Sequence, residues 1–275
     1  MKSNARSDSA TTAQSGGIGP GYEKRVNVLG VGISAINLPL AVKLVAERLD
    51  AGQKGYVTVT GVHGVTEAQS DPEFREILNR SFLCTPDGMP MSWLGWWHGH
   101  KEMDRVYGPD LMQSIMAWSQ DRECRHFLYG GPPGLASELQ RCLEEKYPGV
   151  QIVGVDTPPF RPLNAAEESA LENRMRELKP DIFWVGLSTP KQERFMARYL
   201  ARLDVKLMFG VGAAFDFHAG RVKQAPRWIQ RCGMEWAFRI SQEPRRLWKR
   251  YLTNNPRFIL RTAAQLLKIR DYPLT

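Results

Sequence analysis

Short apolar segments alternate with amphipathic ones along most of this sequence, and this alternation constrains the fold more than any other feature. The clearest apolar segments are residues 26–31, 55–62, 126–129 and 182–187, with weaker ones at 150–155 and 205–211. Helical patterns follow the clear segments at about residues 38–50, 65–79, 135–146 and 191–203. Strands that alternate with helices form parallel sheets. The pattern therefore predicts an α/β fold, a Rossmann-like and mainly parallel sheet flanked by helices.

Composition and charge distribution indicate a globular core with a basic extension. Of the 275 residues, 43% are hydrophobic and 24% are charged, which excludes chain-wide disorder, collagen and small disulfide scaffolds. The formal charge is +8. Residues 221–275 contain 13 Lys and Arg against 3 Asp and Glu, a net +10, so residues 1–220 carry −2. This asymmetry predicts an anionic partner for the last fifth of the chain.

The pattern divides the chain into three parts. Residues 1–24 are expected to be a disordered leader, because they are mostly small and polar and lack the apolar run of a secretory signal. Residues 25–224 form the predicted core, in which 81–104, rich in Trp, Pro and Gly, interrupt the alternation as a small inserted excursion. Residues 225–275 form a basic amphipathic helical appendage, whose last helix is predicted to begin at Asn255, with Pro256 in its first turn.

No metal, cofactor or membrane span is predicted. The four cysteines lie far apart and form no CxxC pair, so they are expected to be buried thiols in a reducing cytosol. His98 and His100 form an H-x-H without a third ligand at a readable spacing, and we expect both at the surface. No segment approaches the roughly 18–20 uninterrupted apolar residues of a spanning helix, so any membrane contact is expected to be peripheral.

A glycine motif after the first apolar segment suggests one class of function. Gly30, Gly32 and Ala35 form G-x-G-x-x-A, a weak signal for dinucleotide binding. The acidic residue expected about 20 positions later is missing, and Thr58 and Thr60 stand there instead. The alternative is an ordinary tight turn from a strand to a helix. An NAD-dependent oxidoreductase is therefore one rival hypothesis.

Polar residues follow a second predicted strand. Ser188, Thr189, Lys191 and Gln192 offer hydroxyl, ammonium and amide groups at a helix N-terminus. In parallel sheets this edge binds nucleotides and sugars. The same residues are equally typical of a well-capped helix, so this segment alone does not decide between the two.

Two charged residues are candidates for catalysis or anion binding. Asp87 follows a short apolar segment and suits a general base at a strand end, although Pro-Asp-Gly is also an ordinary turn sequence. Arg105 could hold a phosphate through forked hydrogen bonds. The alternative is that it is a solvated charge on the surface.

The appendage mixes basic and aromatic residues, which is typical of helices that bind an anionic bilayer or nucleic acid. Its basic residues include Arg239, Arg245, Arg246, Lys249, Arg250, Arg257 and Arg261. An apolar stripe of Ile259, Ala263, Leu266 and Leu267 favours the bilayer. A nucleic-acid-binding module and a helix simply packed on the core stay open as alternatives.

A series of motifs in a fixed order resembles a known family. The motifs are VTVT at 57–60, TPDGMP at 85–90, RVYG at 105–108, PKQE at 190–193, GVGAAFD at 210–216 and EWAFR at 235–239. In this order, over about residues 26–258, they resemble the WecG/TagA/CpsF glycosyltransferases. Met89-Pro90-Met91 is similar to the exopolysaccharide branch of that family.

The resemblance implies a metal-independent, inverting glycosyltransferase that uses no cofactor. Its donor would be a UDP-sugar carrying a hexose or an N-acetylhexosamine, uronic acids included, and its acceptor a polyprenyl-diphosphate-linked sugar. Such enzymes act in the cytoplasm, peripherally on the inner face of the cytoplasmic membrane, in surface or exopolysaccharide synthesis. Nucleic acid is not an implied partner, and homo-oligomerisation stays open.

Individual residues match the family pattern. Asp87 resembles the catalytic base, and Thr58, Arg105 and Gln192 resemble donor-binding residues. The appendage residues that resemble those stabilising the leaving diphosphate are Arg239, Arg246, Lys249 and Arg250. One position departs from the pattern: many relatives have Thr-x-Asn where this chain has Thr58-Val59-Thr60, which leaves the donor sugar open.

Overall fold

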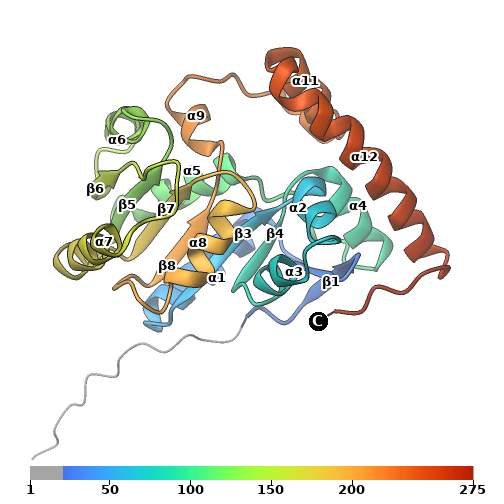
Figure 1. The fold of residues 1–275 in the computed structure, drawn as a ribbon, viewed down its shortest axis with the longest axis horizontal. Coiled ribbons are helices and arrows are strands. Elements are labelled where there is room, and N and C mark those ends of the chain that lie inside the picture. Colours follow the sequence, from blue (N-terminus) through green and yellow to red (C-terminus); the bar gives the residue numbers. More distant parts are fainter. Residues whose placement is uncertain (1–20, 275) are drawn as a thin grey trace, which may run out of the picture.

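The computed structural model describes residues 21–274, except for the side chain of Arg246. Most of the leader expected at residues 1–24 therefore lies outside the described residues. The rest forms an α/β fold with a parallel sheet between two layers of helices, and the appendage runs along one side (Figure 1). The expected fold class is confirmed.

Six parallel strands form the main sheet, in the order β4-β3-β8-β7-β5-β6. The strands are β3 (Gly55–Thr60), β4 (Leu83–Pro86), β5 (Arg125–Gly130), β6 (Gln151–Asp156), β7 (Ile182–Gly186) and β8 (Leu207–Gly210). The helices of the core are α1 (Leu38–Asp50), α2 (Val62–Glu67), α3 (Pro72–Asn79), α4 (Met89–Trp97), α5 (Gly108–Ser119), α6 (Leu135–Lys146), α7 (Ala165–Leu178), α8 (Lys191–Tyr199) and α9 (Ala214–His218).

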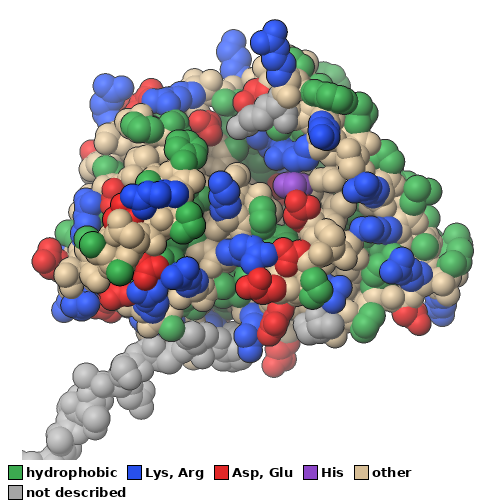
Figure 2. Space-filling view, in the orientation of Figure 1, with side chains coloured by type: hydrophobic (Ala, Val, Ile, Leu, Met, Phe, Trp, Pro, Cys, Tyr) green, Lys and Arg blue, Asp and Glu red, His purple; other side chains and the backbone are tan. Residues whose placement is uncertain are grey.

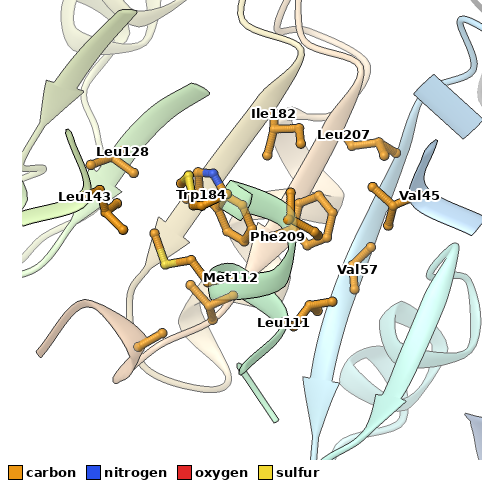
Figure 3. Packing of buried hydrophobic residues seen from close by; sticks show 14 of the residues in the cluster. Val45, Val57, Leu111, Met112, Leu128, Leu143, Ile182, Trp184, Leu207 and Phe209 are labelled. Atoms are coloured by element: carbon orange, nitrogen blue, oxygen red, sulfur yellow. The ribbon is translucent and has the colours of Figure 1, made fainter. Parts of the chain in front are cut away.

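Alternating side chains of the central strands fill two cores, one on each face of the sheet. Trp184 of β7 and Phe209 of β8 point toward α1, α5 and α6 in the larger core (Figure 3). Phe183 and Val185, which flank Trp184 in β7, pack with residues of α7 and α8 on the opposite face. Because both faces are covered, the central strands are apolar throughout, as in other parallel sheets.

The first apolar segment does not belong to the main sheet, and its prediction was wrong. Residues 25–34 form a separate antiparallel hairpin of β1 (Arg25–Val28) and β2 (Val31–Ser34). The two loop residues, Leu29 and Gly30, both have positive φ (53° and 81°), as a tight primed hairpin turn requires. The G-x-G-x-x-A motif is therefore a hairpin turn and one of its strands, not a strand-to-helix turn. This removes the basis for the dinucleotide hypothesis.

The segment expected as an excursion contributes an edge strand to the sheet. β4 pairs with β3, and α4 follows it directly. The predicted helix at 65–79 is two helices, because Asp71 caps a new one: its side chain accepts a hydrogen bond from the Phe74 N–H (2.9 Å), with Pro72 in the first turn.

The appendage contains α10 (Arg227–Arg231), α11 (Glu235–Gln242) and α12 (Pro244–Leu266). The start predicted at Asn255 was wrong, since α12 runs unbroken through Pro256. The first-turn proline that marks its real beginning is Pro244. A proline is unfavourable inside a helix, and here α12 packs against α2, with Phe258 buried among residues of the hairpin and α4. Tertiary packing thus sets the length of this helix.

The far end of the appendage is fixed to the hairpin. The Gln265 side chain accepts a hydrogen bond from the Leu29 N–H (3.0 Å) and donates one to the Asn27 carbonyl oxygen (3.1 Å). Asn27 in turn donates through Nδ2 to the Tyr272 carbonyl oxygen (2.7 Å). The hairpin therefore serves as the docking point for the last residues of the chain.

Candidate active site

A cleft of about 1670 Å³ lies between the carboxyl ends of the sheet strands and the appendage. Figure 2 shows it as a hollow in the surface with Lys and Arg side chains around it. The core side is lined by residues that directly follow strands: Gly61 after β3, Asp87 after β4, Gly131 after β5, Leu187 after β7 and Val211 after β8. This is where open α/β sheets bind their ligands.

Asp87 is a partly buried carboxylate inside this cleft. Its backbone N–H donates to the Thr60 carbonyl oxygen (3.1 Å), so the end of β3 holds it in place. Burial raises its pKa to about 6; Glu235 and Asp110 act in the same direction, while the nearby Arg105 and Arg239 oppose the rise. A carboxylate with this pKa is charged near neutral pH and basic enough to accept a proton.

Gly61 makes the position of Asp87 possible. A Cβ on Gly61 would lie 2.7 Å from the Asp87 carbonyl oxygen and 3.4 Å from its Oδ2. The backbone conformation of Gly61 (φ −112°, ψ −163°) is one that other residues adopt readily. The glycine is therefore required by the close approach of Asp87 and not by its own dihedral angles.

Arg105 connects the core to the appendage. Its guanidinium donates to Gln230 Oε1 in α10 and forms an ion pair with Glu235 Oε2 at the start of α11. The guanidinium also lies over the Tyr107 ring, 4.0 Å from its centroid. Both charged side chains are largely buried, with 10% and 18% of their surface exposed. The residue expected to contact the donor thus lines the cleft with its guanidinium already engaged by the appendage.

Gln192 lines the cleft from the first turn of α8, whereas Thr58 does not. Gln192 is 3% exposed, and its Oε1 has no partner within the described part of the chain. Thr58 is fully buried beneath the floor of the cleft, where its hydroxyl accepts a hydrogen bond from Thr60 (3.3 Å). Its neighbour Val59 reaches the cleft instead. Of these two expected donor-binding residues, only Gln192 is placed to touch a ligand.

The appendage contributes two arginines to the cleft, Arg239 from α11 and Arg250 from α12. Burial opposes the charge of Arg239, but Tyr251, Tyr107, Glu235 and Asp87 outweigh it and raise its pKa overall. The Nε atoms of both arginines are buried and have no hydrogen-bond partner among residues 21–274. Neither guanidinium forms an ion pair within the described residues, so both line the cleft without a bound carboxylate.

The other two basic residues expected here are placed differently. Lys249 is exposed and does not line the cleft. Arg246 belongs to α12, and its side chain lies outside the described parts of the structure. Of Lys249 and Arg250, only Arg250 lines the cleft.

His63 is a cleft residue that the sequence does not reveal. It lies on α2, and its Nδ1 is 2.9 Å from Asn254 Nδ2 of α12. Burial lowers its pKa to about 4, as does the charge of Arg250, and a hydrogen bond to the backbone of Thr189 only partly offsets both. The ring is therefore neutral near pH 7 and links α2, the β7–α8 loop and α12 around the cleft. A single histidine without a motif carries no signal of such a contact.

Within residues 21–274, no three His, Cys, Asp or Glu side chains are grouped closely enough to hold a metal ion. In the same residues, none of the helices has the length and apolar character needed to cross a membrane.

Comparison with known proteins identifies the family. A family model described as "Glycosyl transferase WecG/TagA/CpsF family" matches residues 26–272. The N-acetylglucosaminyldiphosphoundecaprenol N-acetyl-beta-D-mannosaminyltransferase of Bacillus subtilis (strain 168) is 26% identical over 186 residues, or 68% of this chain and 70% of that protein. The protein of the same name from Bacillus spizizenii is 25% identical over 205 residues, or 74% of this chain and 77% of that protein. Because the family match extends over nearly all the described residues, the chain belongs to the WecG/TagA/CpsF family of glycosyltransferases.

Proposed function

We propose that this protein transfers a hexose or N-acetylhexosamine from a UDP-sugar to a polyprenyl-diphosphate-linked sugar. The names of the two Bacillus relatives describe an acceptor in which N-acetylglucosamine is attached to undecaprenol through diphosphate, which supports this acceptor class. UDP as the carrier rests on the resemblance of the motifs at the strand ends. The product would serve a surface polymer or exopolysaccharide.

The observation that carries the proposal is the pairing of one basic carboxylate with two arginines in a single cleft. Asp87 would accept the proton of the acceptor hydroxyl as that oxygen attacks C1 of the donor sugar. The new C1–O bond forms on the face opposite the departing diphosphate, so a single displacement inverts the configuration at C1. Asp87 keeps the proton until it is lost to solvent, and the broken C1–O bond leaves its electron pair on UDP.

Arg239 and Arg250 would stabilise the negative charge that grows on the departing UDP. Guanidinium groups positioned in a partly dehydrated cleft act where the charge develops and need little reorganisation. Their Nε atoms lack partners within the described chain, and the N-terminus of α8 lies on the same cleft. The proposed mechanism therefore uses no metal ion for the leaving group.

The appendage would also place the enzyme at the membrane surface. Trp248, Leu252 and Ile259 of α12 are 51%, 62% and 64% exposed, and basic residues surround them along the helix. Leu252 and Ile259 also line the cleft, so the exposed apolar side chains extend to its edge. Exposed apolar and basic side chains on one helix suit the headgroup layer of an anionic leaflet. We propose a peripheral location on the inner face of the cytoplasmic membrane, where the lipid-linked acceptor would reach the cleft.

The rival hypotheses lose support. The G-x-G-x-x-A motif lies in a hairpin whose turn faces the C-terminal segment, so nothing favours a nicotinamide cofactor there. Nucleic-acid binding was suggested only by the basic appendage. Two of its arginines, Arg239 and Arg250, are directed to the cleft instead.

Replacing Asp87 by Asn tests the proposal. The substitution keeps the size of the side chain but removes the base, and loss of a general base costs about 10²–10⁴ in rate. Turnover would be measured as release of UDP from UDP-glucose, UDP-galactose, UDP-N-acetylglucosamine and UDP-N-acetylmannosamine, with and without a synthetic polyprenyl-diphosphate-linked N-acetylglucosamine. The wild-type protein is expected to release UDP only with the acceptor.

Asp110→Asn is the matched control, because it removes a nearby negative charge from a residue that does not line the cleft. It is expected to keep a rate within about threefold of the wild type, in line with a surface substitution. A wild-type rate in Asp87→Asn would refute the role of the base. Release of UDP from none of the four donors would refute the proposed reaction.

A further inference from the structure

Glu193 is a buried carboxyl group at the start of α8 for which the proposed mechanism has no use. It is 1% exposed, next to Gln192 at 3%. Its Oε1 accepts two hydrogen bonds, one from Thr189 Oγ1 (2.9 Å) and one from Gln192 Nε2 (3.0 Å). Burying a carboxyl group is costly unless it is hydrogen-bonded, and here only Oε1 has partners, since Oε2 has none among residues 21–274.

The contact with Glu193 fixes which end of the Gln192 amide stays without a partner. Glu193 binds Nε2, so Oε1 is the free end; it is buried and has no hydrogen-bond partner among residues 21–274. Burial raises the pKa of Glu193, and a proton on its Oε2 would leave Oε1 as the acceptor. Turning the amide by 180° would bring two acceptor oxygens together. The carboxyl group therefore selects one orientation.

Two glycines at the end of β8 leave room for the amide. A Cβ on Gly210 would lie 3.1 Å from Gln192 Nε2, and a Cβ on Gly212 would lie 3.5 Å from Oε1. The amide group therefore lies in a narrow space between Glu193 and the β8 backbone. Its oxygen can only accept a hydrogen bond, so a ligand group that satisfies it must be a donor.

We propose that Glu193 is a positioning residue that holds the Gln192 amide so that Oε1 accepts a hydrogen bond from a hydroxyl of the donor sugar. This inference rests on the proposed function. A buried acceptor left without its donor strongly disfavours a substrate that lacks the hydroxyl. The pair would thus make the cleft selective for that hydroxyl. If Glu193 instead only stabilises the start of α8, it would affect folding but not sugar selection.

The first test measures the orientation of the amide without any ligand. Hydrogen exchange of the Gln192 side-chain NH₂ is followed by NMR on the full-length protein, with the resonance assigned by its loss in Gln192→Leu. We expect a slowly exchanging signal in the wild type and in Glu193→Gln, which keeps an acceptor oxygen. In Glu193→Leu the signal should exchange at least about tenfold faster, because a hydrogen bond is what protects it. Equal protection in Glu193→Leu would overturn the proposal.

The second test is a double-mutant cycle on sugar recognition. Binding of UDP-glucose, UDP-N-acetylglucosamine and UDP is measured by calorimetry for Glu193→Leu, Gln192→Leu and the double variant. If Glu193 acts through Gln192, each single variant weakens sugar-nucleotide binding by about tenfold or more, and the double variant is no weaker than either. Affinity for UDP alone should stay within about twofold. Additive losses, or equal losses for UDP, would overturn the proposal.

Glu193→Gln guards against a folding defect, since it keeps the shape and one acceptor oxygen and is expected to bind within about threefold of the wild type. The two proposals also fail in different ways. If the wild type binds neither sugar nucleotides nor UDP, the proposed function is refuted, and so is the proposed hydrogen bond between Gln192 and a sugar hydroxyl. If the wild type binds the sugar nucleotides and Glu193→Leu binds them equally well, only the role of Glu193 fails.

Discussion

At the scale of single residues, the charge of Asp87 is set by opposing neighbours. Burial, Glu235 and Asp110 raise its pKa, while Arg105 and Arg239 lower it, and the balance is a pKa of about 6. An ordinary aspartate would be fully charged but a weaker base. The residues that supply this balance come from the core and from the appendage, so the properties of Asp87 depend on both.

The pH dependence of turnover should report this pKa. The carboxylate must be unprotonated to accept a proton, so kcat/KM should be constant above about pH 7 and fall about tenfold per pH unit well below pH 6. The measurement is the rate at low substrate concentration between pH 4.5 and 8.5, with circular dichroism at each pH as a control for folding. If kcat/KM instead falls only near pH 4, Asp87 is not the group whose titration controls the rate.

The same pKa makes Asp87 unfavourable for stability near neutral pH. Its folded pKa is raised from 3.8 to about 6, so the folded state binds a proton more tightly than the unfolded state, and stability is lost as the pH rises through this range. At 1.36 kcal/mol per unit, the charged form costs at most about 3 kcal/mol. Asp87→Asn should therefore raise the free energy of unfolding at pH 8, with little difference at pH 4. Denaturation in urea at both pH values measures this, and a destabilised variant at pH 8 would contradict it.

Gly61 gives a test of position rather than chemistry. In Gly61→Ala the new Cβ would lie 2.7 Å from the Asp87 carbonyl oxygen, so Asp87 must move. We expect a loss of about 10²-fold in kcat, since misplacement by about 1 Å has that effect. Gly99→Ala is the control: it has open space but positive φ, so it should cost up to about 1–2 kcal/mol of stability and no activity. A normal rate in Gly61→Ala would show that the backbone of Asp87 can shift without consequence.

At the scale of secondary-structure elements, the appendage is held at both ends. Arg105 binds the segment from Gln230 to Glu235 at one end, and the hairpin binds Gln265 at the other. Between them, α12 packs on α2 and His63 contacts Asn254. The elements that close the cleft are therefore fixed by polar contacts as well as by apolar packing.

Removing the Arg105 contact should loosen α10 and α11. In Arg105→Met the hydrogen bond to Gln230 and the ion pair with Glu235 are lost. Glu235 then lacks its ion-pair partner, and such a loss costs about 3–5 kcal/mol when the pair is fully buried. We expect trypsin to cleave faster at residues 227–239, measured by mass spectrometry of timed digests. Arg122→Met is the control, because Arg122 is exposed, lies over the Trp118 ring and is outside the appendage. Equal cleavage in both variants would mean that apolar packing alone holds these helices.

At the scale of the whole molecule, charge and apolar exposure are concentrated on the appendage. Residues 221–275 carry a net +10 within a total of +8, and Figure 1 shows α11 and α12 along one side of the molecule. The cleft opens beside the same helices. This arrangement would bring the cleft close to any anionic surface that the appendage binds.

Binding to vesicles tests this arrangement. We expect sedimentation with vesicles of 30% anionic lipid to exceed that with neutral vesicles and to fall with salt, since each basic residue near such a surface contributes about 1 kcal/mol. Replacing Trp248, Leu252 and Ile259 together by Ser should weaken binding at least about tenfold. Trp97→Ser, which changes an exposed aromatic residue (72%) at the end of α4 that does not line the cleft, is the control. Equal binding of both variants would place the membrane contact elsewhere.

The α/β class and most of the strands and helices could be predicted from the sequence, because alternating apolar segments and helix caps act over a few residues. The candidates Asp87, Gln192, Arg239 and Arg250 came from a strand-end position or from motifs that resemble a known family, and all four line the cleft. Four features could not be predicted and depend on tertiary contacts. Residues 25–34 form a hairpin, α12 continues through Pro256, Thr58 is buried beneath the cleft, and Arg105 binds Glu235, 130 positions away. Each of these depends on which distant segment packs against the residue, and that packing energy exceeds local preference.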